Sequence, residues 1–140
     1  MVSTHRSSGF TLIEVVIVVA IIGILAALAL PYFKSEELKK NRYEAIASLT
    51  SAAQELERVH SDFGSYASSA IPSTSQHGHY TIAVSNPGSC GGVQGCYLIT
   101  ATTHGSQTDD KQCTMFTLDN LGLKKSYDDG GTETTSCWSQ

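Results

Sequence analysis

An apolar run near the N-terminus of this 140-residue chain constrains its fold more than any other feature. From Phe10 to Leu30 the run contains one charged residue, Glu14. In a helix, with about 1.5 Å per residue, the uncharged part from Val15 to Leu30 extends ~24 Å, and a start at Phe10 brings the run close to the ~30 Å of a bilayer core. A carboxylate at the bilayer centre costs about 2.5–3.5 kcal/mol, and less near the boundary. Glu14 therefore needs a partner or a purpose.

Beyond Pro31 the helical pattern continues in an amphipathic form. One helical face collects the apolar residues, at steps of seven, four and three: Leu38, Ala45, Leu49, Ala52, Leu56, Val59 and Phe63. We therefore predict a single long helix over residues 10–61, apolar on all sides over 10–31 and amphipathic over 32–63.

Two positions weaken that predicted helix, and one ends it. Gly23 is a poor helix former, and Pro31 removes one backbone hydrogen bond. Gly64 is a typical residue to end a helix.

After a loop over residues 64–79, the pattern changes from helical to alternating. Four short segments are predicted as strands: 79–84, 96–103, 113–118 and 123–127. Short turns join them, which favours an antiparallel meander. The amphipathic half of the helix has the apolar face needed to cover this sheet. We therefore predict an α+β fold in which a long N-terminal helix packs on a four-stranded antiparallel sheet, with residues 64–140 forming the loop and the head.

Four cysteines lie in the last 51 residues: Cys90, Cys96, Cys113 and Cys137. An even number in a small exported head predicts two disulfides, and four cysteines allow three pairings. We favour Cys113–Cys137, which closes the C-terminal region, and Cys90–Cys96, which pinches a glycine-rich loop. A zinc site and free thiols are the alternatives, but the spacing contains no two CxxC pairs.

The charge balance of the head is acidic. From Ser61 onward three basic residues face seven acidic ones. Such a head is poorly suited to nonspecific binding of nucleic acid, although Lys124 and Lys125 form a local basic pair that we interpret as solvated strand ends. No nucleophile elbow or phosphate-binding glycine loop is present, so we predict neither catalysis nor a cofactor.

Two ways of cutting this N-terminus are consistent with a polar start followed by an apolar run. A secretory signal peptide would be cut after Ala29, where Ala27-Leu28-Ala29 supplies an A-x-A site, and would release a soluble domain. Glu14 at the front of the apolar run and the direct continuation of the helix past Ala29 both argue against this alternative.

The second way begins at Gly9-Phe10. The run GFTLIE at 9–14, the apolar stretch through Gly23 and then Pro31 resemble the type IV pilin class, which includes pilus subunits and secretion pseudopilins. The resemblance is strong over residues 7–40. The segment YLITATTHGSQTDDKQCTMFTLDNLGLK and the late Cys137-Trp138 resemble the tail of small minor pilins, and the type IV pilin fold is the fold expected.

This resemblance implies how the chain is processed. A prepilin peptidase would cut between Gly9 and Phe10, remove the leader of residues 1–9, and methylate the new Phe10 amine. Glu14 would pair with that amine on a neighbouring subunit, and Gly23 and Pro31 would match the region that loosens when subunits pack. An acid that merely complements the positive end of the helix is the alternative role for Glu14.

The resemblance also implies partners and location. The chain would be a minor pilin that works with other pilin subunits, the peptidase, an inner-membrane assembly platform and membrane lipid. It would lie in the bacterial inner membrane as a precursor and then in a filament in the periplasm and at the cell surface. Adhesion, twitching motility, competence for DNA uptake, and secretion as a pseudopilin all remain open, and DNA is a disfavoured partner because the head is acidic.

Two clusters of side chains are candidate metal sites, and one aromatic residue, Trp138, is a candidate binding contact. His77 and His79 lie close together in the sequence, and His60 and His104 are further candidate ligands. We expect His77 and His79 to form a solvated turn rather than a metal site. The stretch 128–131 with Glu133 does not match an EF-hand loop; calcium binding near the C-terminus, as in some pseudopilin heads, is the alternative to a plain hairpin tip. Trp138 is expected to pack over the disulfide, and an exposed contact is its alternative.

Overall fold

The computed structural model describes residues 9–66, 71–85, 89–90 and 93–139, with residues 89, 90, 93 and 94 described by their backbone alone. Contacts divide the chain into two compact units, Met1–Ser35 and Glu36–Gln140. The elements are α1 (Leu12–Phe63), β1 (Tyr80–Ser85), β2 (Ser89–Cys90), β3 (Val93–Gln94), β4 (Leu98–Thr103), the 3-10 helix η1 (Gly105–Asp109), β5 (Met115–Asp119), β6 (Lys124–Tyr127) and β7 (Glu133–Thr134).

The predicted long helix is present, shifted by two residues at each end. It continues through Pro31 without a break in the assignment. It ends at Gly64, whose φ of 71° places it in the left-handed region and whose N–H donates to the His60 carbonyl at 2.8 Å. Glycine adopts this conformation without the clash that a side chain would cause, so Gly64 ends the helix as predicted.

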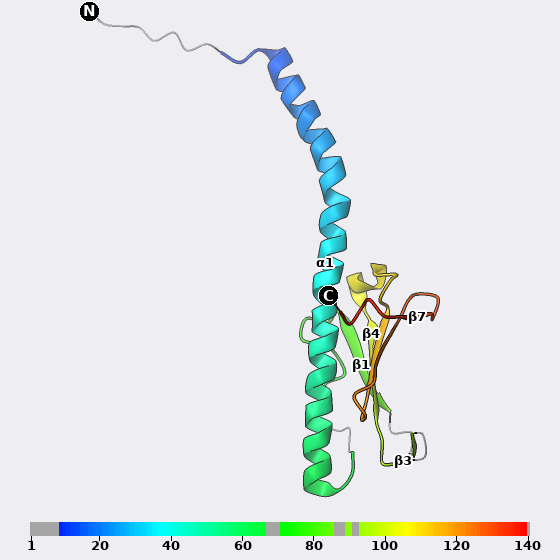
Figure 1. Cartoon of the computed structure of the whole chain (residues 1–140). Helices are drawn as coiled ribbons and strands as arrows, with labels where there is room; N and C mark the ends of the chain where they lie inside the picture. Colours follow the sequence, from blue (N-terminus) through cyan, green and yellow to red (C-terminus); the bar gives the residue numbers. More distant parts are fainter. Residues whose placement is uncertain (1–8, 67–70, 86–88, 91–92, 140) are drawn as a thin grey trace, which may run out of the picture. The chain divides into compact units, whose positions relative to one another are not determined.

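The head sheet is antiparallel throughout, in the order β1-β4-β5-β6-β7. The α+β prediction is thus confirmed, but the strand count was wrong: the sheet has five strands, and β2 and β3 form a separate two-stranded ladder. The extra strand β7 has two residues, too few for an alternating pattern to be visible. Figure 1 shows β7 beside the other strands of the head.

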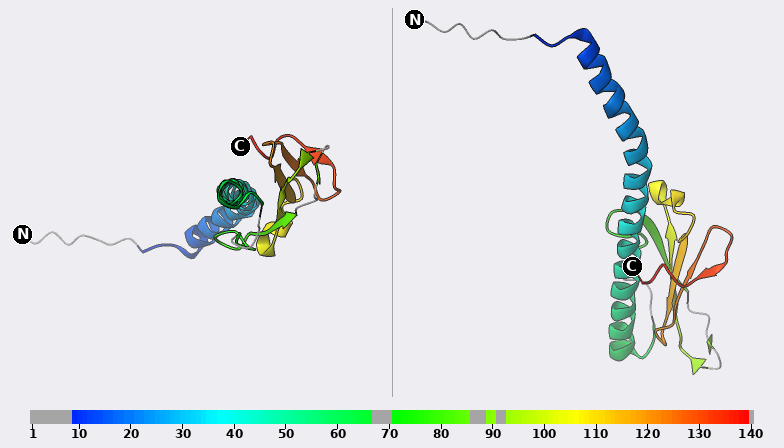
Figure 2. Two further views of the ribbon diagram at one scale, coloured as in Figure 1. Left: turned by 90° about the horizontal axis from the view of Figure 1, so that it is seen from below. Right: turned by 45° about the horizontal axis from the view of Figure 1, so that its top comes forward.

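Within the unit Glu36–Gln140, α1 covers one face of the sheet (Figure 2). The helix contributes Ala45, Leu49, Ala52 and Leu56 to the core. The strands contribute alternate residues that face the helix: Tyr80, Ile82, Ile99, Ala101, Phe116 and Leu118. This alternation places every second side chain of a strand against the helix and explains the change of period seen in the sequence.

The predicted apolar face of α1 needs two corrections. Phe63 is 76% exposed, because it is the last residue of the helix and the chain turns away at Gly64. Arg42 is buried, although it is charged. It occupies the position between Leu38 and Ala45 that the 3-4 spacing assigns to the buried face.

Candidate functional site

The N-terminal apolar segment has no cover in the part of its own unit that the structure describes. Large apolar residues from Phe10 to Phe33 are exposed on all sides of α1, Phe10 and Leu12 to about 80%. By its length and hydropathy, α1 is a candidate membrane-spanning helix, and none of its most apolar window is buried in the structure. Side chains that are apolar in every direction need an apolar surrounding, either lipid or the same surface of other helices.

Glu14 lies in the first turn of α1, near the start of this segment. Its backbone N–H faces the Thr11 hydroxyl at 3.4 Å, which supplies a weak cap. An acid in the first turn complements the positive end of the helix dipole. Among residues 9–66, 71–85 and 95–139, no side chain forms an ion pair with the Glu14 carboxylate. The geometry is therefore consistent with both roles considered for this acid, an exposed cap and a partner for another molecule.

The remaining predicted residues of the segment lie before α1 or in its exposed N-terminal half. Gly9 and Phe10 precede the helix, which begins at Leu12. A Cβ added at Gly23 would meet no atom within 4 Å, so no contact inside the described part of this chain requires a glycine there. The roles of Gly9, Phe10, Gly23 and Pro31 stay predictions.

In the head, a buried ion pair joins α1 to the segment that follows η1. Arg42 Nε lies 2.7 Å from Asp110 Oδ2, and Arg42 Nη2 lies 2.8 Å from Asp110 Oδ1. The two residues are 5% and 3% exposed. Bidentate arginine–carboxylate pairs of this kind are strong and fix geometry, and breaking one side leaves an uncompensated buried charge.

Gln107 extends this pair into a network. It is fully buried, and its amide donates to the Leu38 carbonyl at 3.0 Å and to the Tyr80 hydroxyl at 3.1 Å. Asn41 Nδ2 donates to Gln107 Oε1 at 3.1 Å. Burial raises the pKa of Tyr80, and the Asp110 carboxylate raises it further. The network joins η1 and β1 to the helix, and we name it the Arg42 clamp: Asn41, Arg42, Tyr80, Gln107 and Asp110.

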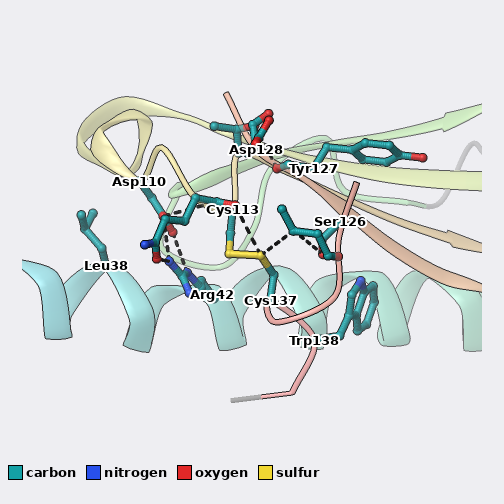
Figure 3. Close-up of a disulfide and its surroundings, with 12 residues drawn as sticks. Leu38, Arg42, Asp110, Cys113, Ser126, Tyr127, Asp128, Cys137 and Trp138 are labelled. Atoms are coloured by element: carbon teal, nitrogen blue, oxygen red, sulfur yellow. Dashed lines mark hydrogen bonds and ion pairs between the residues drawn. A yellow bond between two sulfur atoms is a disulfide. The ribbon is translucent and has the colours of Figure 1, made fainter. Parts of the chain in front are cut away.

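The predicted Cys113–Cys137 disulfide is present, with a Cα–Cα distance of 5.9 Å, and lies beside the clamp (Figure 3). Trp138, next in sequence, is half-buried. Its ring meets that of Phe116 edge to face at 5.9 Å, and its Nε1–H donates to the Lys125 carbonyl at 2.8 Å. Trp138 thus packs on the core. Cys96 is also disulfide-bonded. The side chain of Cys90 lies outside the described residues, so the Cys90–Cys96 pair stays a prediction.

The histidine turn is held by a carboxylate of α1. Glu44 Oε2 lies 2.6 Å from His79 Nδ1 and 3.4 Å from His77 Nδ1, and Glu44 Oε1 accepts the His77 backbone N–H at 2.7 Å. Burial raises the pKa of Glu44, but hydrogen bonds from Ser75, His79 and His77 outweigh it and lower the pKa to about 2. The loop before β1 is therefore anchored to the helix by an ionised acid.

The acidic turn after β6 uses its carboxylate internally. Asp128 Oδ1 accepts the backbone N–H groups of Gly130 and Thr132 at 2.9 and 2.8 Å. Asp129 and Glu133 lie opposite Lys111 and Lys125. In the described part of the chain, no group of three or more His, Cys, Asp or Glu side chains is arranged to hold a metal ion.

Most basic side chains of the head already face an acid. In the unit Glu36–Gln140, ion pairs with acids involve Lys39, Arg42, Arg58, Lys111 and Lys125. Lys124 instead places its Nζ 5.3 Å from the centre of the Trp138 ring. No described acid pairs with Lys40 or Lys124.

Sequence reasoning missed the Arg42 clamp and the Glu44 anchor. A charged residue on an otherwise apolar helical face was the available signal for Arg42. No local pattern identifies Gln107, Asp110 or Glu44, because their partners on other elements lie 27 or more residues away.

Two family models match the chain. The model described as "Type IV minor pilin ComP, DNA uptake sequence receptor" matches residues 31–117, and the "Prokaryotic N-terminal methylation motif" matches residues 4–30. Together they cover both the candidate cleavage site and most of the head.

Curated relatives include pilins and secretion pseudopilins. Type II secretion system core protein G of Pectobacterium carotovorum subsp. carotovorum is 34% identical over 74 residues, 53% of this chain and 44% of the relative. Type IV major pilin protein PilA of Myxococcus xanthus is 54% identical over 44 residues, 31% of this chain and 20% of the relative. A fimbrial protein of Pseudomonas aeruginosa is 38% identical over 69 residues, 49% of this chain and 45% of the relative. The chain thus spans less than half the length of these relatives.

Solved pilin structures share the fold. A type IV pilin from Shewanella oneidensis has a TM-score of 0.54 at 24% identity, covering 74% of this chain and 99% of that one. The Neisseria meningitidis non-core minor pilin PilV has a TM-score of 0.54 at 16% identity, covering 70% and 94%. Four observations agree: the long helix, the antiparallel sheet, the exposed apolar segment, and a minor-pilin family match over more than half of the sequence. The chain therefore belongs to the type IV minor pilin family.

Proposed function

We propose that this pilus subunit is assembled after a peptidase cuts between Gly9 and Phe10 and methylates the new amine, and that Glu14 pairs with that amine on a neighbouring subunit. One observation carries the proposal: the segment from Phe10 to Phe33 is exposed and apolar on all sides, with a single acid near its start. Helices with such surfaces associate by packing, and a single charge pair in their contact sets the axial position.

The pairing has a physical reason that depends on cleavage. In the uncut chain, the amide of Phe10 carries no charge. Cutting at Gly9 creates a cation near the start of the same helix. The carboxylate of Glu14 is then neutralised only when the subunit has moved alongside another one, so that a subunit out of register keeps an unpaired charge in an apolar surrounding.

Before assembly the same segment would hold the precursor in the inner membrane, where the assembly platform and the peptidase act. The length of the apolar run and the methylation-motif match support this location. A released soluble domain, cut after Ala29, is the competing outcome.

N-terminal sequencing and mass measurement of protein from filaments test the proposal. A chain that starts at N-methylated Phe10 supports it, and one that starts at Leu30 overturns it. Gly9→Val should block cleavage and leave the full-length precursor in the membrane fraction. Val2→Ala, also in the predicted leader, is the matched control and should be processed normally.

A second candidate function is binding of double-stranded DNA by the head, because the matching family is described as a DNA uptake sequence receptor. The acidic balance of the head opposes strong nonspecific binding. Lys40 and Lys124, the two cations without a described acidic partner, are the phosphate contacts that we propose. Each contact to a phosphate contributes about 0.9 to the slope of log K against log salt concentration.

Gel-shift titration of the full chain in detergent against duplex DNA, at several salt concentrations, tests this second function. Lys40→Gln with Lys124→Gln should weaken binding and lower the slope by about 2. Lys39→Gln is the control, because Lys39 is already paired with Glu36 at 2.8 Å. Absence of any shift at low salt would remove the DNA function and leave the filament role untouched.

A further inference from the structure

An aromatic pair stands at the end of the exposed apolar run. Tyr32 and Phe33 follow Pro31 directly, and they are 65% and 67% exposed. Their ring centroids lie 6.4 Å apart in an edge-to-face arrangement. Charged residues begin immediately afterwards, with Lys34, Glu36, Glu37, Lys39 and Lys40 within seven positions.

We propose that Tyr32 and Phe33 are a membrane-interface anchor that binds lipid headgroups and the adjoining acyl chains, and that this anchor sets the depth of Glu14 in the bilayer. The inference rests on the proposed membrane precursor but not on its cleavage. Lipid is the partner that continues the surface already required by residues 10–30, since those side chains are apolar in every direction and the charges start just beyond the pair.

Aromatic side chains favour this position for a physical reason. Tyrosine and other amphipathic rings prefer the boundary between headgroups and hydrocarbon, where one end is apolar and the other is wet. The hydroxyl of Tyr32 supplies the polar end, and the ring of Phe33 extends the apolar one. A pair that is exposed and held ring to ring presents this surface without any rearrangement of the helix.

The helix length converts the anchor into a depth for Glu14. Leu12, the first residue of α1, precedes Tyr32 by twenty residues, which corresponds to ~30 Å and matches the thickness of a hydrocarbon core. Glu14 precedes Tyr32 by eighteen residues, or ~27 Å, and therefore lies only about 3 Å inside the opposite boundary. A tilt of ~20° shortens the projected helix by about 2 Å and moves Glu14 slightly deeper.

At this depth a carboxylate reaches the headgroups and keeps most of its hydration, so the precursor tolerates an unpaired Glu14. The segment at Gly9 and Phe10, which precedes the helix, then lies outside the hydrocarbon, where an enzyme reaches it. The aromatic pair thus makes the charge tolerable before assembly, while the same charge in the middle of a helix bundle demands a partner.

Depth-dependent fluorescence quenching tests the anchor directly. The full-length, uncut chain with Phe33→Trp and Trp138→Phe is reconstituted in phosphatidylcholine vesicles whose acyl chains carry bromine either near the headgroup or near the bilayer centre. We expect the shallow bromines to quench the tryptophan introduced at position 33 more strongly than the deep ones. Tyr43→Trp, an exposed aromatic position further along α1, is the matched control and should be quenched by neither lipid.

Three results would overturn the anchor. Stronger quenching by the deep bromines at position 33 would place the pair inside the hydrocarbon. No quenching at position 33 by either lipid would mean that the pair packs on protein or faces water. Quenching at position 43 as well would mean that the helix lies along the membrane surface.

Moving the pair tests the depth of Glu14. Leu28→Tyr and Ala29→Phe, combined with Tyr32→Ser and Phe33→Ser, shift the aromatic pair by one turn, or ~6 Å. A nitroxide attached at Ile17→Cys should then lie ~6 Å further from the Glu14-side boundary, as measured by oxygen and nickel-chelate accessibility. Tyr43→Ser should leave the label where it was. An unmoved label would overturn the proposal, and because the chain is uncut, cleavage defects such as that of Gly9→Val cannot produce this outcome.

Discussion

Two charged residues of the same helix, Glu14 and Arg42, lie in opposite environments. Glu14 lies in an exposed apolar segment without an ion-pair partner among the described residues. Arg42 is buried and paired through two hydrogen bonds with Asp110. In the head, Asp110 of the same chain neutralises the charge of Arg42; in the N-terminal segment, no described residue pairs with Glu14 or covers the apolar surface around it. Under the proposed role of Glu14, one half of this helix serves the stability of the head and the other half serves assembly.

The apolar residues of α1 repeat the contrast. Ala45, Leu49 and Leu56 are fully buried against the strands of the head. Val15, Ile22 and Leu25 have equally apolar side chains, yet at least half of each is exposed. The difference is that the second half has a sheet to cover, whereas the first half has no complementary surface within the described part of its own unit.

The largest expected effect on function is a loss of assembly. Glu14→Gln removes the charge with little change of volume, and we expect at least a tenfold loss of the subunit from sheared filaments, because ~1.4 kcal/mol of pairing free energy corresponds to a factor of ten. Immunoblots of filament and membrane fractions measure the ratio. Glu37→Gln, an exposed acid on the same helix, is the control and should assemble normally. Equal incorporation of the Glu14 variant would contradict the pairing.

The Arg42 clamp should dominate the stability of the head. Arg42→Met leaves Asp110 buried without its cation, and we expect a loss of about 3–5 kcal/mol in the free energy of unfolding. Urea unfolding of the full chain, followed by the fluorescence of Trp138, its single tryptophan, measures the change. The exposed pair of Arg58 with Glu55 supplies the comparison, and Arg58→Met should have little effect. Similar losses in the free energy of unfolding for Arg42→Met and Arg58→Met would contradict the prediction that burial makes the Arg42 pair the important one.

The disulfide should contribute somewhat less. Cys113→Ser with Cys137→Ser opens a crosslink between residues 24 positions apart. The chain-entropy model gives about 3.5 kcal/mol for a loop of this length. Thermal unfolding measures the loss, and incorporation into filaments should decline only as far as folding does.

Peptide mapping under non-reducing conditions tests the predicted Cys90–Cys96 pair. Detection of either cysteine in another pairing would refute this prediction.

The smallest expected effect on stability concerns Glu44 and depends on pH. Its pKa is about 2 in the folded chain, against 4.5 as the reference value. A lowered pKa stabilises the fold above pH ~4.5, and this contribution is lost as the pH falls from about 4.5 towards 2. Glu44→Gln should therefore destabilise the head by about 2 kcal/mol at pH 7. Near pH 2 the difference should vanish, and a gap that stays constant with pH would contradict the assignment.

The sequence predicted the architecture because periodicity is local. The 3.6-residue period of Ala45, Leu49 and Leu56, and the alternation at Tyr80 and Ile82, are visible without knowing the partner element. Gly64 was predicted from an equally local signal, whereas the Cys113–Cys137 pair was favoured because it closes the C-terminal region. Strand β7 was missed because two residues are too few to show a period. Phe63 was assigned to the apolar face by its spacing, but its position at the helix end leaves it exposed.

The amino-acid sequence by itself determined that this chain has an apolar N-terminal helix with one acid, an amphipathic continuation and a short-stranded, disulfide-bonded head. Hydrophobic period, glycine conformation and an N-terminal methylation motif are properties of neighbouring residues, and neighbouring residues are what a sequence displays. Only the tertiary structure decided that Arg42 meets Asp110, that Gln107 joins helix and strand, and that Glu44 holds the histidine turn. These contacts join residues 27 to 69 positions apart, and a polar side chain carries no mark of its distant partner until the fold brings the two together.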